Sequence, residues 1–389
     1  MEQRENSVGD IVKGQEGTAD GVARWLRGFG GEEATARVLS MCMTMAARVK
    51  NVDLVKQLLE QGAKPEMAAH PDHPQDPAAI VSYDGEDDWT TPWSAAVSVD
   101  SAECLEAMIN AGMNPVKPRL FVDELVDQEA FLAVEAARLG AERCLAVAMD
   151  WAQKKAGPKL AIITKESWAA LNSRHGSADK VEAMARILIG AGGNIDEECF
   201  EWSGSKTPMT PLGSAACGDL EMLMGLLAAG ADPRVGFALN FAAGSWHEKS
   251  AQCVSHLLRA GCDPNLKRDG AAPLLGAIEI NNTDKARMLI DAGANLDAVS
   301  AEGFSLLAVA AIRGASRCVS LLLDEGFDPD ERTEGMSLAE LTSKFRREHC
   351  LPETRDMAEA MGIIKAASEA KTLAVASGEA QKKMAARRI

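Results

Sequence analysis

Aromatic residues make up only 4% of the 389 residues and include a single tyrosine, whereas alanine, leucine and methionine are plentiful. This composition favours helices over sheets. There is no run of about 18 apolar residues, so we expect no membrane-spanning helix. The polar start of the chain likewise predicts no signal peptide. The nine cysteines form no Cys-x-x-Cys pair, which is typical of a reduced, cytoplasmic protein.

Motifs of common enzymes are also missing. The sequence holds no Gly-x-x-x-x-Gly-Lys-Ser/Thr phosphate loop, no Gly-x-Ser-x-Gly elbow and no His-Glu-x-x-His motif. His70 and His73 lie close to Asp72 and Asp76, but a third clear ligand is lacking and the flanking prolines favour a solvated loop. We therefore expect no catalytic residues, no cofactor and no metal.

The net charge of −16 argues against nucleic-acid binding, because an acidic chain is repelled by a phosphate backbone. The same charge suits solubility and a basic protein partner. Nucleic acid and membranes are thus not expected as partners.

A short phrase recurs along the chain: an apolar pair, one or two small or charged residues, a glycine, and often an Asp or Asn two positions later. The phrase reads Leu-Leu-Glu-Gln-Gly-Ala-Lys at 58–64 and Leu-Leu-Ala-Ala-Gly-Ala-Asp at 226–232, and seven copies occur in all. It predicts a helix that ends at a glycine in the left-handed conformation. In the later copies these glycines lie 31, 32 and 33 residues apart, at Gly230, Gly261, Gly293 and Gly326.

A second phrase precedes each glycine and predicts the start of another helix. It reads Thr-Pro-Trp-Ser-Ala-Ala at 91–96 and Thr-Pro-Leu-Gly-Ser-Ala-Ala at 210–216, and looser copies begin at Ala272 and Ser305. Thr or Ser caps such a helix, and proline fits its first turn.

Together the two phrases resemble the ankyrin repeat, whose corresponding motif is Thr-Pro-Leu-His-x-Ala-Ala. The resemblance implies a ladder of hydrogen bonds from the motif histidine to neighbouring turns. The four motif copies lack that histidine and carry Ser94, Gly213, Leu275 and Ala308 in its place. We expect a weaker ladder but the same fold.

The resemblance predicts an all-α fold, an ankyrin-repeat solenoid of about eight helix–turn–helix repeats with hairpin-like finger loops and a capping helix at each end. Two less obvious repeats are expected at 131–152 and 164–192. The predicted divisions are a disordered N-terminus with a capping helix (1–31), the array (32–345), and a C-terminal capping helix with a basic tail (346–389).

Four cysteines occupy one position of the second helix in their repeats: Cys104, Cys144, Cys253 and Cys318. Four cysteines at one structural position indicate packing rather than reactivity, because a buried thiol behaves as a small apolar side chain. We expect all four in the core.

Function in a solenoid is expected where the repeats are irregular, since insertions extend one face of the array. The longest insertions are 65–90 and 196–210, and the turn at 244–249 is also extended. Aromatic residues dominate binding hot spots, although those in the loops can equally fold back onto their own repeats. The candidate protein-binding residues are Tyr83, Asp87, Asp88, Trp89, Phe200, Glu201, Trp202, Trp246, His247 and Arg268.

Ankyrin proteins generally bind other proteins, so the resemblance implies an interaction module or scaffold that grips a partner with its fingers and concave helix face. Acidic residues recur in the fingers and end with Asp328, Asp330, Glu331 and Glu334. They are either a solvated face or a stripe that attracts a basic partner. The alternative function is therefore an acidic inhibitor or immunity-type protein that blocks a basic toxin or nuclease.

Overall fold

The structure, a computed structural model, describes residues 32–65, 91–113, 116–118, 129–171, 177–199, 209–333, 335–349 and 354–386. The chain divides into two compact units, Met1–Cys199 and Phe200–Ile389. The predicted N-terminal segment 1–31 lies outside the described residues.

The first unit is built of consecutive helix pairs. In chain order its elements are α3 (Glu32–Arg48), α4 (Val52–Glu60), α5 (Pro92–Ser98), α6 (Ala102–Asn110), β1 (Val116–Pro118), β2 (Glu129–Phe131), α7 (Leu132–Leu139), α8 (Glu142–Lys155), the short 3-10 helix η2 (Gly157–Lys159), α9 (Leu160–Ala170) and α10 (Ala178–Gly190). The first helices α3, α5, α7 and α9 contact one another in sequence, and so do the second helices α4, α6, α8 and α10. Strands β1 and β2 pair antiparallel, so a hairpin joins α6 to α7.

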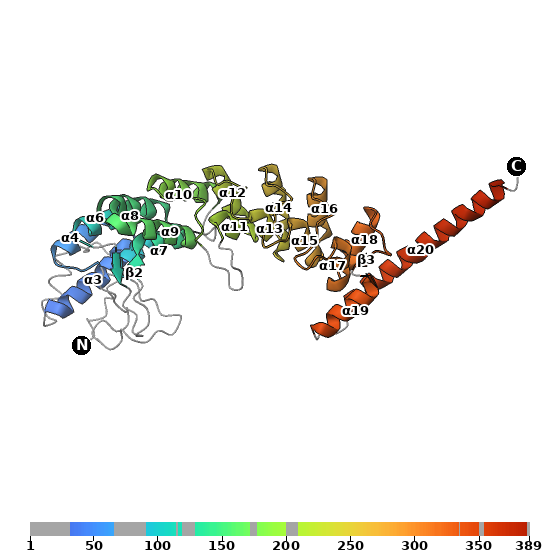
Figure 1. The fold of residues 1–389 in the computed structure, drawn as a ribbon. Coiled ribbons are helices and arrows are strands. Elements are labelled where there is room, and N and C mark those ends of the chain that lie inside the picture. The colour runs from blue at the N-terminus through green and yellow to red at the C-terminus, as the bar shows by residue number, and fades with distance from the viewer. Residues whose placement is uncertain are drawn as a thin grey trace. The chain divides into compact units, whose positions relative to one another are not determined.

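The second unit repeats this plan (Figure 1). Its elements are α11 (Pro211–Ala216), α12 (Leu220–Ala229), α13 (Ala238–Gly244), α14 (Ser250–Arg259), α15 (Pro273–Glu279), α16 (Thr283–Asp291), α17 (Leu306–Arg313), α18 (Ser316–Asp324), β3 (Arg332–Thr333), β4 (Met336–Ser337), α19 (Leu338–Glu348) and α20 (Arg355–Ala386). The first helices α11, α13, α15, α17 and α19 form one row, and α12, α14, α16, α18 and α20 form the other.

The predicted glycine stop is confirmed at all seven phrases. Gly62, Gly112, Gly192, Gly230, Gly261, Gly293 and Gly326 all have φ between 89° and 102°. The residue after each glycine donates its N–H to the carbonyl five residues back, at 2.9–3.1 Å, as Ala231 does to Leu226. These bonds satisfy carbonyls that the helix end leaves open.

The predicted helix starts are confirmed where Thr or Ser is present. The hydroxyl oxygens of Thr91, Thr210 and Ser305 accept the N–H of the residue three positions later at 3.1–3.2 Å. Pro92 and Pro211 follow at the first helical position, where no N–H donor is needed.

The four repeated cysteines are completely buried, as predicted. Burial raises the pKa of each thiol, to about 11 for Cys253 and about 12 for Cys318. A thiol with so high a pKa stays protonated at neutral pH and is a poor nucleophile. These cysteines therefore fill the core between the helices.

Neighbouring repeats are joined at the turns between their two helices. Asp100, at φ 51°, accepts the backbone N–H of Cys144 at 2.9 Å, and Asn281, at φ 55°, accepts those of Arg317 and Cys318 at 3.1 and 3.2 Å. Each of these side chains thus caps the second helix of the next repeat. Asn and Asp tolerate the left-handed conformation that this geometry requires.

Asn240 performs the bridging that the resemblance assigned to histidine. Its amide nitrogen donates to the carbonyls of Leu266 at 3.2 Å and Ala271 at 3.1 Å, on both sides of the finger after α14. Asn240 lies at the motif position for histidine when Ala242 and Ala243 are aligned with the motif's two alanines. In this repeat the hydrogen-bond ladder is retained by a different residue.

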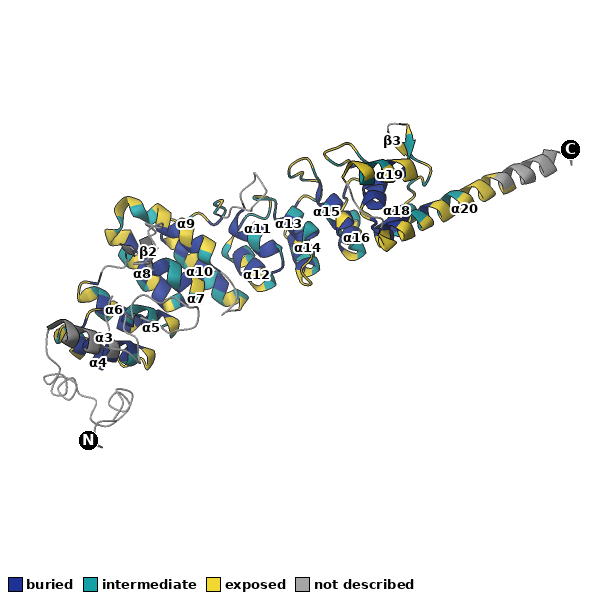
Figure 2. Cartoon of the chain, turned by 90° about the horizontal axis from the view of Figure 1, so that it is seen from below, coloured by how far each residue is buried: buried dark blue, intermediate teal, exposed yellow. Residues whose placement is uncertain are grey.

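α20 begins against the last repeat and then extends away from it (Figure 1). Met357, Ala360 and Ile364 are buried, and α20 contacts both α17 and α18. Figure 2 shows mostly exposed residues along α20 beyond α18. The predicted boundary after residue 345 falls within α19. The last helix, α20, continues to Ala386 and so includes part of the predicted basic tail.

Candidate functional site

Seven of the ten candidate residues lie outside the described residues: Tyr83, Asp87, Asp88, Trp89, Phe200, Glu201 and Trp202. The other three, Trp246, His247 and Arg268, lie in the second unit at α13 and the finger after α14. The structure does not bring these three together. Arg268 packs on Phe241 in the middle of α13, whereas Trp246 and His247 follow the C-terminal end of this helix.

Trp246 lies on the turn between α13 and α14, residues 244–250, which we call the Trp246 turn. Its side chain is 79% exposed, more than any other large apolar side chain in the described part of the chain. His247, Glu248 and Lys249 on the same turn are also exposed. A tryptophan in this position offers a large apolar surface with one polar N–H.

The backbone of the Trp246 turn is fixed by side-chain hydrogen bonds. The Ser245 hydroxyl donates to the carbonyl of Cys217 at 2.5 Å, which ties the turn to the preceding repeat. The Ser250 hydroxyl lies 2.5 Å from the carbonyl of His247 and 3.2 Å from that of Ser245. The His247 Nδ1 accepts the N–H of Lys249 at 3.2 Å, which fixes that ring nitrogen as an acceptor.

The His247 ring covers Gly218, which belongs to the turn of the preceding repeat. A β-carbon on Gly218 would lie 2.3 Å from two ring atoms of His247, so only glycine leaves room for the ring. The ring is thus a packing element between two turns. Trp246 beside it stays exposed.

Lys285 of α16 reaches the same turn from inside the protein. Its side chain is 1% exposed, and its Nζ donates to the carbonyls of Ala242 at 2.8 Å and Ser245 at 2.6 Å, with Ala243 at 3.4 Å. Burial lowers the pKa of Lys285 to about 8. Our sequence interpretation missed this residue, although Lys285 lies eight residues before Gly293, the position that Cys253 and Cys318 hold before their glycines.

Arg268 makes contacts within its own repeat array, at the finger after α14. Its guanidinium carbon lies 4.1 Å from the centre of the Phe241 ring, and its Nε is 3.6 Å from the Asp269 carboxylate. Its backbone pairs with Ala271, which closes the finger. A cation over an aromatic ring stabilises the pair when both are partly withdrawn from water, so Arg268 stiffens the finger that Asn240 holds.

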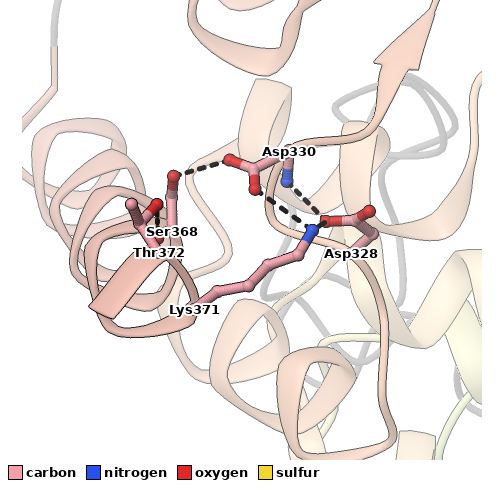
Figure 3. Close-up of polar contacts among 5 residues, drawn as sticks. All are labelled: Asp328, Asp330, Ser368, Lys371 and Thr372. Atoms are coloured by element: carbon pink, nitrogen blue, oxygen red, sulfur yellow. Dashed lines mark hydrogen bonds and ion pairs between the residues drawn. The ribbon is translucent and has the colours of Figure 1, made fainter. Parts of the chain in front are cut away.

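Three acidic residues of the last finger, Asp328, Asp330 and Glu331, are bonded within the chain, and Figure 3 shows the first two; Glu334 lies outside the described residues. Lys371 of α20 lies 2.5 Å from Asp328 and 3.1 Å from Asp330, and the Ser368 hydroxyl donates to Asp330 at 2.5 Å. These hydrogen bonds hold the pKa of both carboxyls below the usual range. Glu331 accepts a hydrogen bond from Ser305. This part of the predicted acidic stripe is therefore bonded internally.

The residues that the structure describes hold neither a metal-binding cluster nor a membrane-spanning helix. No group of three or more His, Cys, Asp or Glu side chains in those residues is arranged to hold a metal ion. Within the same residues, no helix has the length and apolar character needed to cross a membrane.

The mostly helical fold is consistent with ankyrin repeats, and sequence comparison shows such repeats in one part of the chain. The family model described as ankyrin repeats (3 copies) matches residues 239–333, from α13 to β3, and this part of the chain consists of ankyrin repeats. Ankyrin repeats indicate a protein–protein interaction module.

One curated relative is similar to this chain over a limited stretch. The E3 ubiquitin-protein ligase KEG of Arabidopsis thaliana is 36% identical over 110 residues. The match covers 26% of this chain and 7% of the relative. The chain therefore corresponds to a small part of that protein's length.

Proposed function

We propose that the chain is a non-enzymatic binding module of eight ankyrin repeats, four in each unit, formed by the pairs from α3–α4 to α17–α18. It holds a protein partner through its finger loops and the concave face of its first helices. Among the described residues, the Trp246 turn is also part of this proposed binding surface. The observation that carries the proposal is the 79% exposure of Trp246 on a turn fixed by hydrogen bonds.

An exposed tryptophan on a fixed backbone has the properties of an interface anchor. Tryptophan is enriched among the few residues that dominate binding energy, because it buries a large area with few rotatable bonds. Fixing the turn beforehand reduces the entropy lost when a partner binds. Ser245, Ser250 and His247 supply that order before any partner arrives.

An acidic inhibitor of a basic toxin or nuclease is the second candidate. The net charge of −16 supports it, since opposite charge accelerates association. Asp328 and Asp330 are paired with Lys371, so an inhibitor of this kind would have to use the acidic residues of the other fingers. Its association rate should fall steeply between low and physiological salt, whereas a rate independent of salt contradicts it.

The test of the proposed function is capture of partners by the full chain and by Trp246→Ala, followed by mass spectrometry. Met224→Ala is the matched control, because Met224 is also an exposed apolar residue but lies on α12. We expect Trp246→Ala to lose at least one partner that Met224→Ala and the unaltered chain retain. Equal recovery by all three proteins, with equal thermal unfolding, contradicts a role for the Trp246 turn.

A further inference from the structure

Lys285 is a charged residue at a core position of the repeat. The residues eight positions before the other capping glycines of the second unit are Met222, Cys253 and Cys318, and all three are buried. A buried ammonium group is unfavourable unless acceptors replace its water. The site around Lys285 must therefore supply such acceptors.

The acceptors come from the C-terminal end of α13. The carbonyls of Ala242 and Ala243 belong to its last turn, where a helix has unsatisfied carbonyls and a partial negative charge. The carbonyl of Ser245 belongs to the first extended residue beyond the helix. One ammonium group thus links the end of α13 to the beginning of the Trp246 turn.

The same part of the turn is packed closely against α15. A β-carbon on Gly276 would lie 3.2 Å from the backbone nitrogen of Gly244, so the backbones of α15 and the turn are in close contact. Lys285 follows on α16, the partner helix of α15. The backbone that carries Trp246 is thus held from the following repeat by Gly276 and Lys285, and from the preceding repeat by the hydrogen bond of Ser245 to Cys217.

We propose that Lys285 is a positioning residue for the Trp246 turn: it fixes the backbone that presents Trp246 without itself reaching the surface. The consequence for partner affinity rests on the proposed function, whereas the consequence for the turn does not. Loss of the Lys285 cation should leave the Ser245 carbonyl with only the longer contact to the Ser250 hydroxyl, at 3.2 Å, and allow Trp246 to sample several orientations.

The protonation of Lys285 offers a way to test this proposal. The titratable groups that face its Nζ are the thiols of Cys217 and Cys253, and burial raises the pKa of both, to about 11 for Cys253. Both thiols are therefore neutral where Lys285 titrates. His247, Glu248 and Lys249 of the turn itself are exposed. Deprotonation leaves two N–H donors for three carbonyls.

The experiment follows the ¹⁹F resonance of Trp246 in the full chain labelled with 5-fluorotryptophan, assigned with Trp246→Phe, between about pH 6.5 and 9.5, around the pKa of Lys285. We expect one resonance that shifts with a midpoint near pH 8. Lys285→Met should remove this titration and broaden or split the resonance. Lys249→Met, which alters an exposed lysine on the same turn, should keep the midpoint.

A resonance of the unaltered chain that does not change across this pH range overturns the proposal, as does a Lys285→Met spectrum identical to it. If Lys285→Met fails to fold, the pH titration of the unaltered chain and the Lys285→Arg variant decide. A shift that disappears in Lys285→Arg supports the proposal, because the larger guanidinium stays charged throughout. If the Trp246 resonance titrates but Trp246→Ala loses no partner, the inference about Lys285 holds and the proposed function fails. The two claims can therefore fail separately.

Discussion

The backbone nitrogen of Met357 lies 2.8 Å from the point that a β-carbon on Gly314 would occupy. Gly314 lies in the turn between α17 and α18 and has φ 69°. In their own repeats Asp100 and Asn281 hold the same position, and each caps the second helix of the next repeat. Here Thr354 accepts the N–H of Met357 instead, at 3.2 Å. The start of α20 thus packs after α18 as the next second helix would. Its cap is its own Thr354, and no side chain of residue 314 separates the two backbones.

Replacing Gly314 should therefore weaken the docking of α20. Gly314→Ala combines a left-handed residue with an overlap against the backbone at Met357, and we expect a loss of about 2–3 kcal/mol in the free energy of unfolding. Gly326→Ala is the control, since it shares a positive φ but has open space around it, and should cost about 1 kcal/mol. Urea unfolding measures both, and equal losses would refute a specific contact.

The contact of Lys371 with the last finger should make the middle of α20 sensitive to acid. The pKa values of Asp328 and Asp330 are lowered in the folded chain, so their contribution is present above the ordinary carboxyl pKa. It is lost as pH falls through the lowered values.

We expect hydrogen exchange at 366–372 to accelerate in Lys371→Met at neutral pH. We also expect carboxyl ¹³C titrations to show higher pKa values for both aspartates. Lys365→Met removes an exposed lysine near Glu369 and should change neither observable. Unchanged aspartate pKa values in Lys371→Met would show that the ion pairs are not formed in solution.

The bridge made by Asn240 should be replaceable by the residue that the ankyrin motif favours. Asn240→Ala removes two hydrogen bonds to the finger and leaves the carbonyls of Leu266 and Ala271 without this donor, so we expect a loss of about 1–3 kcal/mol. Asn240→His should recover at least half of it. Thermal unfolding of the full chain measures the effect, and a neutral Asn240→Ala contradicts the bridge.

Between pH 8 and 10.5, Lys285 should oppose the loss of stability that the buried thiols cause. The pKa of Lys285 is about 8 in the folded chain against an ordinary value of 10.5, so at this residue the unfolded chain binds more protons in this window and the contribution of Lys285 to the free energy of unfolding rises with pH. The buried thiols contribute in the opposite direction, because their pKa values are raised, and Lys285→Met leaves that part in place. The rise due to Lys285 is on the order of 3 kcal/mol. Urea midpoints of the unaltered chain and of Lys285→Met measure it, and an equal slope in both would exclude Lys285 as its source.

Local signals in the sequence predicted the parts of the fold that depend on local chemistry. The helix stop at Gly230 and the cap at Thr210 are each decided within a few residues, and both were predicted correctly. The burial of Cys253 followed from its repeated position. These features need no knowledge of what lies across the structure.

The contacts that define the candidate site join residues far apart in the chain. Lys285 and Ser245 are 40 residues apart, and Lys371 and Asp328 are 43 apart. The sequence did carry a sign of the first, because a lysine replaces cysteine at a core position, but the pattern could not tell which carbonyls it meets. Arg268 was predicted to bind a partner, and the structure shows it over Phe241.

The most direct test of the central claim is the dissociation constant of a partner captured by the full chain, measured for the unaltered chain, Trp246→Ala and Met224→Ala. Truncation of an interface tryptophan typically costs about 2 kcal/mol or more. We predict that Trp246→Ala weakens binding at least about tenfold, with Met224→Ala close to the unaltered chain. Equal dissociation constants for all three proteins would contradict the claim that the Trp246 turn binds the partner.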